Sequence, residues 1–254
     1  MKKIHLIWII SLLLTLVICG IAAFVVRIAE DPLGSIYQSN NYPNSSRFTN
    51  RESFLIDPET ILESLNNGKI EVFTPYLDQV DGELPENVFN GPISWTPDEH
   101  FMIAGALNHL VWNDDLNNWK LYEMDFLLDC QDNLNGFERS YMMYFKGFLT
   151  YDVRAFSIIP RYRYVEWRED LDHSHPLLGW KSIDLKRLRI NAPDALEIAE
   201  ENGGKGFRLK SNNHCRIRVF LQPEYSSGWV VRYSNVNSID FQLTIDPITG
   251  KIIK

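Results

Sequence analysis

The sequence FQLTIDPITGKIIK, residues 241–254, alternates apolar and polar side chains up to Ile245 and then changes character. Asp246, Pro247 and Gly250 form a turn signature, because an Asp side chain accepts backbone hydrogen bonds at the start of a tight turn and glycine takes the positive φ that closes it. Two isoleucines follow the turn. The stretch therefore predicts an antiparallel hairpin, with one full strand and one short strand, at the edge of a sheet.

A capped helix followed by alternating strands is a recurring order in the chain. Residues 57–73 predict a short helix and a strand, and residues 96–112 open with TPDE, the spacing of a capping box, before apolar side chains at helical intervals. Two alternating runs then surround a turn at residues 132–136, and residues 191–204 predict another helix that stops at a glycine pair. We therefore expect an α+β fold of two small helix-plus-antiparallel-sheet units, which a duplication would explain.

The last third of the chain resembles the PepSY domain, a module of secreted metallopeptidase propeptides and bacterial envelope proteins. Three stretches follow the family's order: DALEIAEENGG (194–204), GWVVRY (228–233) and FQLTIDPITGKII (241–253). The resemblance covers residues 179–254, and a divergent second copy upstream would fit the recurring order. It implies a small non-catalytic α+β unit that restrains peptidases or modulates envelope proteins. No peptidase domain follows Lys254, so it also implies that a restrained enzyme is a separate chain.

A long apolar segment lies near the start of the chain. Residues 6–26 carry no charge, and as a helix they would rise about 31 Å, enough to cross the hydrocarbon core of a bilayer. Lys2 and Lys3 before the segment favour an N-terminus inside the cell and a body outside it. A cleaved signal peptide, with a shorter apolar core, is the alternative. We expect residues 1–30 to be a cytoplasmic stub and single membrane anchor, and the polar residues 31–56 to be a flexible stalk.

The net charge of the chain is −8, which argues against nucleic acid and against adhesion to anionic lipid. This charge is distributed unevenly: residues 57–178 hold 22 acidic and 8 basic side chains, a balance of −14, and residues 179–254 hold 8 acidic and 12 basic, a balance of +4. We expect these ranges to be an acidic α+β domain and the PepSY-like domain. They attract each other, recruit different partners, or present separately solvated surfaces.

Two cysteines lie outside the apolar segment, Cys130 in the acidic domain and Cys215 in the C-terminal domain. In an oxidising compartment outside the cell they would pair and link the two domains. Two free buried thiols are the alternative, because the sequence does not show whether the two Cα atoms come within about 7 Å.

Signatures of the common enzyme classes are missing from the sequence. It contains no Gly-x-Ser-x-Gly, no local signature of a thiol enzyme and no glycine-rich phosphate loop before a helix. His173 and His175 have acidic neighbours but no third ligand at a metal-binding spacing. We expect no catalytic activity, no metal site and no cofactor.

Basic and apolar side chains alternate in three stretches of the C-terminal domain, FRLK, CRIRVF and WVVRY. If all three are strands, their basic side chains share one face of the sheet and their apolar ones face the helix. This face would dock an acidic surface, either of the acidic domain or of an anionic partner, and an ordinary solvated sheet face is the alternative. Its candidate binding residues are Arg208, Lys210, Arg216, Arg218 and Arg232.

Together these features predict a single-pass cell-membrane protein whose extracytoplasmic body is a non-enzymatic binding or regulatory module for another envelope protein. A sensory or small-ligand-binding domain is the alternative, and a lined cavity between the two units would be its mark. A hydrolase would instead require clustered carboxylates or histidines in a cleft.

Overall fold

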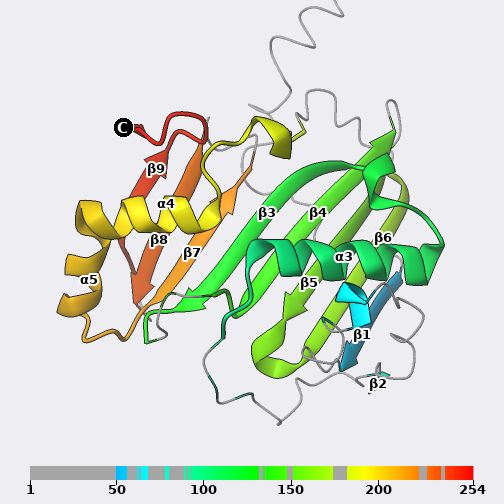
Figure 1. Ribbon diagram of the computed structural model, residues 1–254, viewed down its shortest axis with the longest axis horizontal. Helices are drawn as coiled ribbons and strands as arrows, with labels where there is room; N and C mark the ends of the chain where they lie inside the picture. The colour runs from blue at the N-terminus through cyan, green and yellow to red at the C-terminus, as the bar shows by residue number, and fades with distance from the viewer. Residues whose placement is uncertain are drawn as a thin grey trace, which may run out of the picture.

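Antiparallel strands make up most of the computed structural model, which describes residues 50–55, 62, 64–67, 78–79, 89, 91, 93–131, 134, 136–147, 151–173, 182–222, 228–235 and 238–253 (Figure 1). The strands are β1 (Asn50–Leu55), β2 (Asp78–Gln79), β3 (Lys120–Asp129), β4 (Arg139–Gly147), β5 (Tyr151–Ile159), β6 (Tyr164–His173), β7 (Arg216–Leu221), β8 (Trp229–Asn235), β9 (Ser238–Ile245) and β10 (Ile252–Ile253). The helices are α3 (Pro97–Trp112), α4 (Ala192–Ala199) and α5 (Lys205–Lys210), with a π-helical turn η7 (Glu200–Gly204) and the 3₁₀ turns η4 (Leu116–Asn118), η5 (Pro160–Tyr162) and η6 (Leu185–Arg187).

All ten strands belong to one sheet, in the order β10-β9-β8-β7-β3-β4-β5-β6-β1-β2. The expected division into two small helix-plus-sheet units, and with it a duplication, is therefore wrong. The strand that overturns it is β7, which pairs with β3 from Met124–Leu221 to Asp129–Arg216 and joins the acidic and C-terminal parts into one continuous sheet.

The expected boundaries near the N-terminus also change. The stalk does not extend to residue 56, because β1 occupies residues 50–55 and pairs with β6. Within the expected helix at residues 57–68, the described residues Leu62 and Ser64–Asn66 are helical. The expected anchor at residues 6–26 lies outside the described residues. In the part of the chain that the structure does describe, every helix is too short or too polar to traverse a bilayer.

The helix α3 forms as its sequence predicts. The Thr96 hydroxyl accepts a hydrogen bond from the Glu99 backbone N–H, and the Glu99 carboxylate accepts one from the Thr96 backbone N–H at 2.6 Å, which completes the capping box. The helix ends at Asn113, which takes a left-handed conformation with φ 48°. Ile103 and Leu107 are fully buried against β4 and β5, so the apolar stripe of the helix lies on the sheet.

The predicted helix at residues 191–204 begins as expected but does not stop. Asn191 and Asp194 form a second capping box. At the glycine pair the chain kinks through η7, where Gly203 has φ +123°, and continues as α5. The stretch FRLK, residues 207–210, is therefore helical and not a strand.

The predicted C-terminal hairpin is confirmed. Asp246 accepts hydrogen bonds from the backbone N–H groups of Ile248 and Thr249, at 2.8 and 2.7 Å, and Gly250 has φ +70°. The turn leads into β10 at the edge of the sheet. Both α3 and α4 lie on the same face of the sheet, and the main core fills the space beneath them (Figure 1).

Candidate functional site

A groove of about 510 Å³ lies on the helix-covered face of the sheet, between the start of α3 and the kinked α4–α5 helix. Side chains from both the acidic and the C-terminal parts of the chain line it, and its volume is within the range of ligand-binding sites. Its lining residues are Trp95, Thr96, Pro97, Leu134, Gly136, Phe137, Pro193, Leu196, Glu197, Glu200, Lys205 and Arg208.

One wall of the groove consists of two segments that a backbone hydrogen bond joins. The Phe137 backbone N–H donates to the Trp95 carbonyl at 3.0 Å, which holds the segment before α3 against the segment before β4. The approach is so close that a Cβ on Gly136 would lie 2.5 Å from the backbone of Ser94, so this position requires glycine. Both aromatic rings of this wall are more than nine-tenths buried, which makes the wall rigid and apolar.

Leu134 lines the same wall in an unusual conformation. Its φ is +56°, in the left-handed region that an apolar branched residue rarely adopts. Asparagine or glycine would fit this backbone with less strain. Leucine at this position places a half-buried apolar side chain in the groove, and local strain of this kind is concentrated at functional sites.

The opposite wall contains a neutralised polar cluster. Arg208 donates to both carboxylate oxygens of Glu200, with two contacts of 3.0 Å from its Nε, and the Tyr233 hydroxyl donates to Glu200 at 2.7 Å. The hydrogen bond to Glu200 raises the pKa of Arg208, and burial together with the same carboxylate raises the pKa of Tyr233. The charges of Glu200 and Arg208 therefore cancel, and the cluster holds this side of the groove in place without giving it a net charge.

The kink between α4 and α5 depends on this cluster. A Cβ on Gly204 would lie 2.3 Å from the Tyr233 hydroxyl oxygen, and the Tyr233 ring is fully buried. Only glycine lets the helix approach the sheet closely enough for Glu200 to reach Tyr233. The glycine pair that predicts a helix end thus sets the direction of the α5 wall.

His100 lies behind the groove and is fully buried. Its Nε2 lies 3.2 Å from the Phe137 carbonyl oxygen, and its Nδ1 lies 2.8 Å from the Ser140 hydroxyl. The carbonyl requires a proton on Nε2, so Nδ1 accepts from the hydroxyl and the ring is neutral. Burial lowers the pKa of His100 to about 3. The side chain therefore fixes the Phe137 wall and is not placed to exchange protons near neutral pH.

His100 and Trp95 are not among the predicted site residues, although their spacing in the sequence matches a known helix-start pattern. Trp95 precedes the cap of α3 and His100 is the fourth residue of the helix, the two positions of a hydrophobic staple. Their ring centroids are 5.4 Å apart.

The predicted basic face is not continuous. Arg208 and Lys210 lie on α5 and not on a strand, so the expectation of period two fails for these two residues. Arg208 also lines the groove. The three remaining candidate residues lie on the adjacent strands β7 and β8, as predicted: Arg216, Arg218 and Arg232.

Arg218 and Arg232 are directly opposite each other across β7 and β8, on the face of the sheet away from α4. Both guanidinium groups lie over the Phe220 ring, at 4.7 and 5.4 Å from its centroid. Arg218 also donates from Nε to the Asp125 carboxylate of β3 at 2.7 Å. One member of the predicted basic face thus contacts the acidic part of the same chain.

Cys130 and Cys215 form a disulfide, with Cα atoms 5.2 Å apart. They lie at the end of β3 and just before β7, and the Cys130 backbone N–H donates to the Cys215 carbonyl at 3.0 Å. Both residues are buried. The bond therefore fastens the seam between the acidic and C-terminal parts of the sheet, where β3 pairs with β7.

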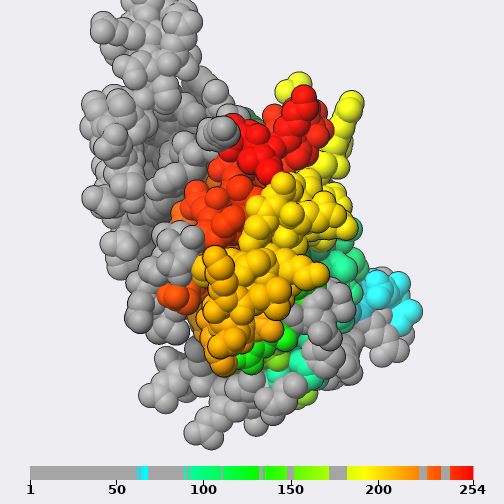
Figure 2. All heavy atoms as spheres, turned by 90° about the vertical axis from the view of Figure 1, so that its left-hand side faces the viewer, coloured from blue at the N-terminus to red at the C-terminus, as the bar shows by residue number. Residues whose placement is uncertain are grey.

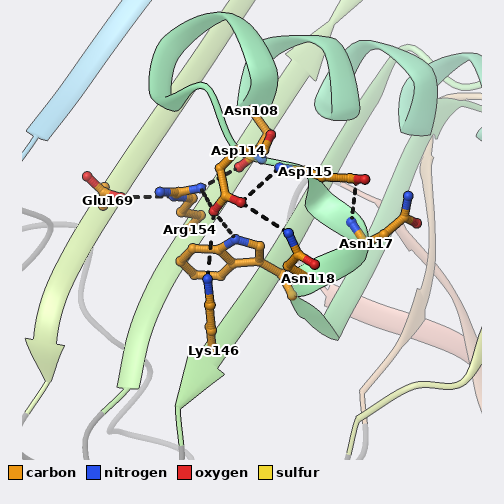
Figure 3. Close-up of polar contacts among 9 residues, drawn as sticks. Asn108, Asp114, Asp115, Asn117, Asn118, Lys146, Arg154 and Glu169 are labelled. Carbon is orange, nitrogen blue, oxygen red and sulfur yellow. Dashed lines mark hydrogen bonds and ion pairs between the residues drawn. The ribbon is translucent and has the colours of Figure 1, made fainter.

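The densest polar network lies away from the groove, at the end of α3 (Figure 3). Arg154 of β5 donates to Glu169 and Asn108 at 2.8 Å each and to Asp114 at 3.1 Å. Its guanidinium lies between the rings of Trp112 and Trp119, at 4.3 and 4.1 Å from their centroids.

Asp114 is the more accessible of the two carboxylates that Arg154 contacts. The Trp119 indole N–H donates to it at 2.8 Å, and this hydrogen bond is the main reason that the pKa of Asp114 falls to about 2. Because both of its carboxylate oxygens accept hydrogen bonds within the protein, the network is suited to holding α3 on the sheet and not to acid–base chemistry.

No group of three or more His, Cys, Asp or Glu side chains is arranged to hold a metal ion in the described ranges. The chain matches no protein-family model, no curated protein and no solved structure.

Proposed function

We propose that the protein is a non-enzymatic binding module, held outside the cell at its membrane, that accepts an apolar group of another envelope protein in the groove between α3 and α4–α5. The observation that carries this proposal is Leu134, an apolar side chain kept in the groove by a left-handed backbone. A residue of this type in this conformation is unfavourable for folding alone, and contact with a partner would explain it.

The groove also has the composition of a binding site. Pro193 is exposed and Leu134 is half-buried in the groove, and the buried side chains of Trp95, Phe137 and Leu196 complete its apolar lining. The ion pair at its side is already satisfied within the protein. An apolar group entering the groove would displace water without leaving a buried charge unpaired. Recognition would then depend on shape and apolar contact.

The membrane location rests on the apolar segment at residues 6–26 and its flanking charges. The disulfide supports an oxidising compartment outside the cytoplasm. The resemblance of residues 179–254 to the PepSY domain supports a regulatory role on a peptidase or another envelope protein.

A second candidate function is the binding of a small apolar ligand by the same groove. Its volume of about 510 Å³ falls within the range of small-molecule sites, which is the observation that favours this alternative. The two candidates differ only in what occupies the groove.

Site-specific photocrosslinking in native membranes tests the proposal. A photoreactive phenylalanine analogue replaces Pro193, an exposed residue of the groove, and in a parallel protein it replaces Leu209, an exposed α5 residue outside the lining. We expect a protein adduct from position 193 and not from position 209. A small mass increase of the intact chain at position 193 would instead select the small-ligand alternative.

A matched pair of variants completes the experiment. Leu134→Asn keeps the left-handed backbone but removes the apolar side chain, and it should abolish the adduct formed at position 193. Leu209→Asn changes the same residue type outside the groove and should leave the adduct unchanged. Equal labelling at both positions, or an adduct that survives Leu134→Asn, would reject the groove as the binding site.

A further inference from the structure

Exposed apolar side chains gather at one end of the molecule. Three of the six large hydrophobic residues that are exposed in the described part of the chain belong to η6 and the β9–β10 hairpin: Leu185 at 44%, Ile248 at 49% and Ile252 at 41%. The two elements are joined, because the backbone N–H groups of Arg189 and Ile190 donate to the Pro247 carbonyl at 2.9 and 3.0 Å.

Two perpendicular views agree on this position. Figure 1 places η6 and the C-terminal turn at the top of the molecule. Figure 2 shows the yellow segment around η6 beside the red turn at the same end. We refer to Leu185, Lys186, Arg187, Arg189, Ile248, Lys251 and Ile252 as the C-terminal patch.

The basic members of the C-terminal patch are all exposed to solvent: Lys186, Arg187, Arg189 and Lys251. Of the two acidic residues in the same segments, Asp184 accepts from the Lys186 backbone N–H at 3.1 Å and forms an exposed ion pair with Arg187 at 3.6 Å, and Asp246 accepts from the backbone of its own turn. Four basic and two acidic side chains give this end a balance of +2, whereas the whole chain has −8.

The turn that carries Ile248 is firmly held. A Cβ on Gly250 would lie 3.3 and 3.4 Å from the side chains of Ile190, which precedes α4, and Ile198, near the end of α4, so the turn packs closely on this helix. Asp246 caps the turn from within. Ile248 is therefore presented to solvent by a rigid support and is not exposed by a loose loop.

We propose that the C-terminal patch lies on an anionic membrane surface. Apolar side chains beside lysine and arginine are the combination that binds the interface of such a membrane, where apolar groups enter the boundary of the acyl chains and cations lie among the phosphates. Since the residues outside this end carry a net charge of −10, that is −8 less the +2 of this end, the same membrane repels the chain as a whole and favours an approach through this end. The overall charge, which argues against anionic lipid, thus orients the protein.

Amide hydrogen exchange of the full chain in liposomes tests this proposal. One sample contains phosphatidylcholine alone, and the other contains phosphatidylglycerol as about a third of its lipid. We expect exchange at residues 185–190 and 248–253 to be at least about fivefold slower in the anionic liposomes, the effect of one basic residue at such a surface. Strands β3 and β4 serve as the internal reference and should exchange equally in both.

Two variants with the same loss of charge separate the patch from general electrostatics. In the first, Lys186, Arg187, Arg189 and Lys251 become glutamine, and the difference between the two lipids should disappear. In the second, four exposed basic residues outside the patch and the groove become glutamine, and the difference should remain: Lys120, Arg139, Lys210 and Arg216. Equal exchange in both lipids, or equal effects of the two variants, would overturn the proposal. Neither result bears on the groove, which the crosslinking tests separately.

Discussion

Replacing Arg154 by methionine removes the centre of the polar network that joins α3 to the sheet. The Arg154 side chain is 8% exposed, and its partner Glu169 is 7% exposed. Methionine keeps a long apolar side chain between the rings of Trp112 and Trp119, so the substitution removes mainly charge and hydrogen bonds. It leaves the carboxylate of Glu169 without its arginine and takes a donor from the fully buried amide of Asn108.

The expected cost follows from these contacts. Breaking a buried ion pair by removing one partner costs about 3–5 kcal/mol, because the remaining charge stays buried. The two cation–π contacts add about 1 kcal/mol, of which methionine restores a part. We therefore expect Arg154→Met to lower the free energy of unfolding by about 4 kcal/mol, which lowers Tm by roughly 8–16 °C in a body of this size.

Urea unfolding followed by circular dichroism at neutral pH measures this effect. Arg139→Met is the matched control, because Arg139 is an exposed residue of the neighbouring strand β4 and its loss should change the free energy by less than about 0.5 kcal/mol. Arg154→Lys should lie between the two, since lysine keeps the charge but not the planar fork. A loss below about 1 kcal/mol for Arg154→Met would refute the reasoning that the network stabilises the attachment of α3.

Three further predictions concern the seam and the groove. Between pH 6.5 and about 3 the unfolded chain binds a proton at His100 that the folded chain excludes, so the free energy of unfolding decreases as the pH falls through this window, by about 4 kcal/mol at its lower end. His100→Gln should lose this pH dependence, which urea unfolding at pH 7 and pH 4 measures. Replacing Cys130 and Cys215 by serine should cost about 2–5 kcal/mol in the same assay, because the bond closes a loop with a sequence separation of 85; an equal stability of the reduced and oxidised wild-type protein would contradict this. Gly204→Ala should destabilise the fold by about 1–3 kcal/mol, because the added Cβ would clash with buried Tyr233. Gly206→Ala has open space around the added Cβ and should stabilise the fold by about 0.5–1 kcal/mol. The opposite order of the two variants in thermal unfolding would show that the kink tolerates a side chain.

The sequence predicts those elements whose signals are local. The capping box at Thr96, the helix start at Asn191 and the turn at Asp246 each depend on residues within four positions of one another, and all three are present. The pairing of β3 with β7 is different, because it joins residues about ninety positions apart and no local pattern encodes it. The error in fold class comes from this one long-range pairing.

The basic face was misplaced for a related reason. Four residues such as FRLK fit both a period of two and a period of 3.6, so periodicity alone does not separate a strand from a helical turn. The glycine pair before them reads as a helix end, yet here Gly204 allows close approach to Tyr233 and the helix resumes. The position of Arg208 in the groove follows from that contact with the sheet, which the sequence does not reveal.

The position of the groove at the seam links its occupancy to the joining of the two parts of the sheet. Leu134 and Phe137 of the first wall follow Cys130 along the chain, and the second wall precedes Cys215, so the disulfide joins the two chain segments that lead to the walls. An occupant that contacts Leu134 on one side and Leu196 on the other binds only when both walls are in place. By linkage, the pairing of the two parts of the sheet strengthens binding, and binding stabilises that pairing by the same free energy. Because the disulfide is buried and acts mainly on the unfolded state, its removal lowers the stability without necessarily moving the walls. If the groove binds as proposed, its partner meets a junction that is already fixed, and the specificity of binding would reside in the shape of the groove.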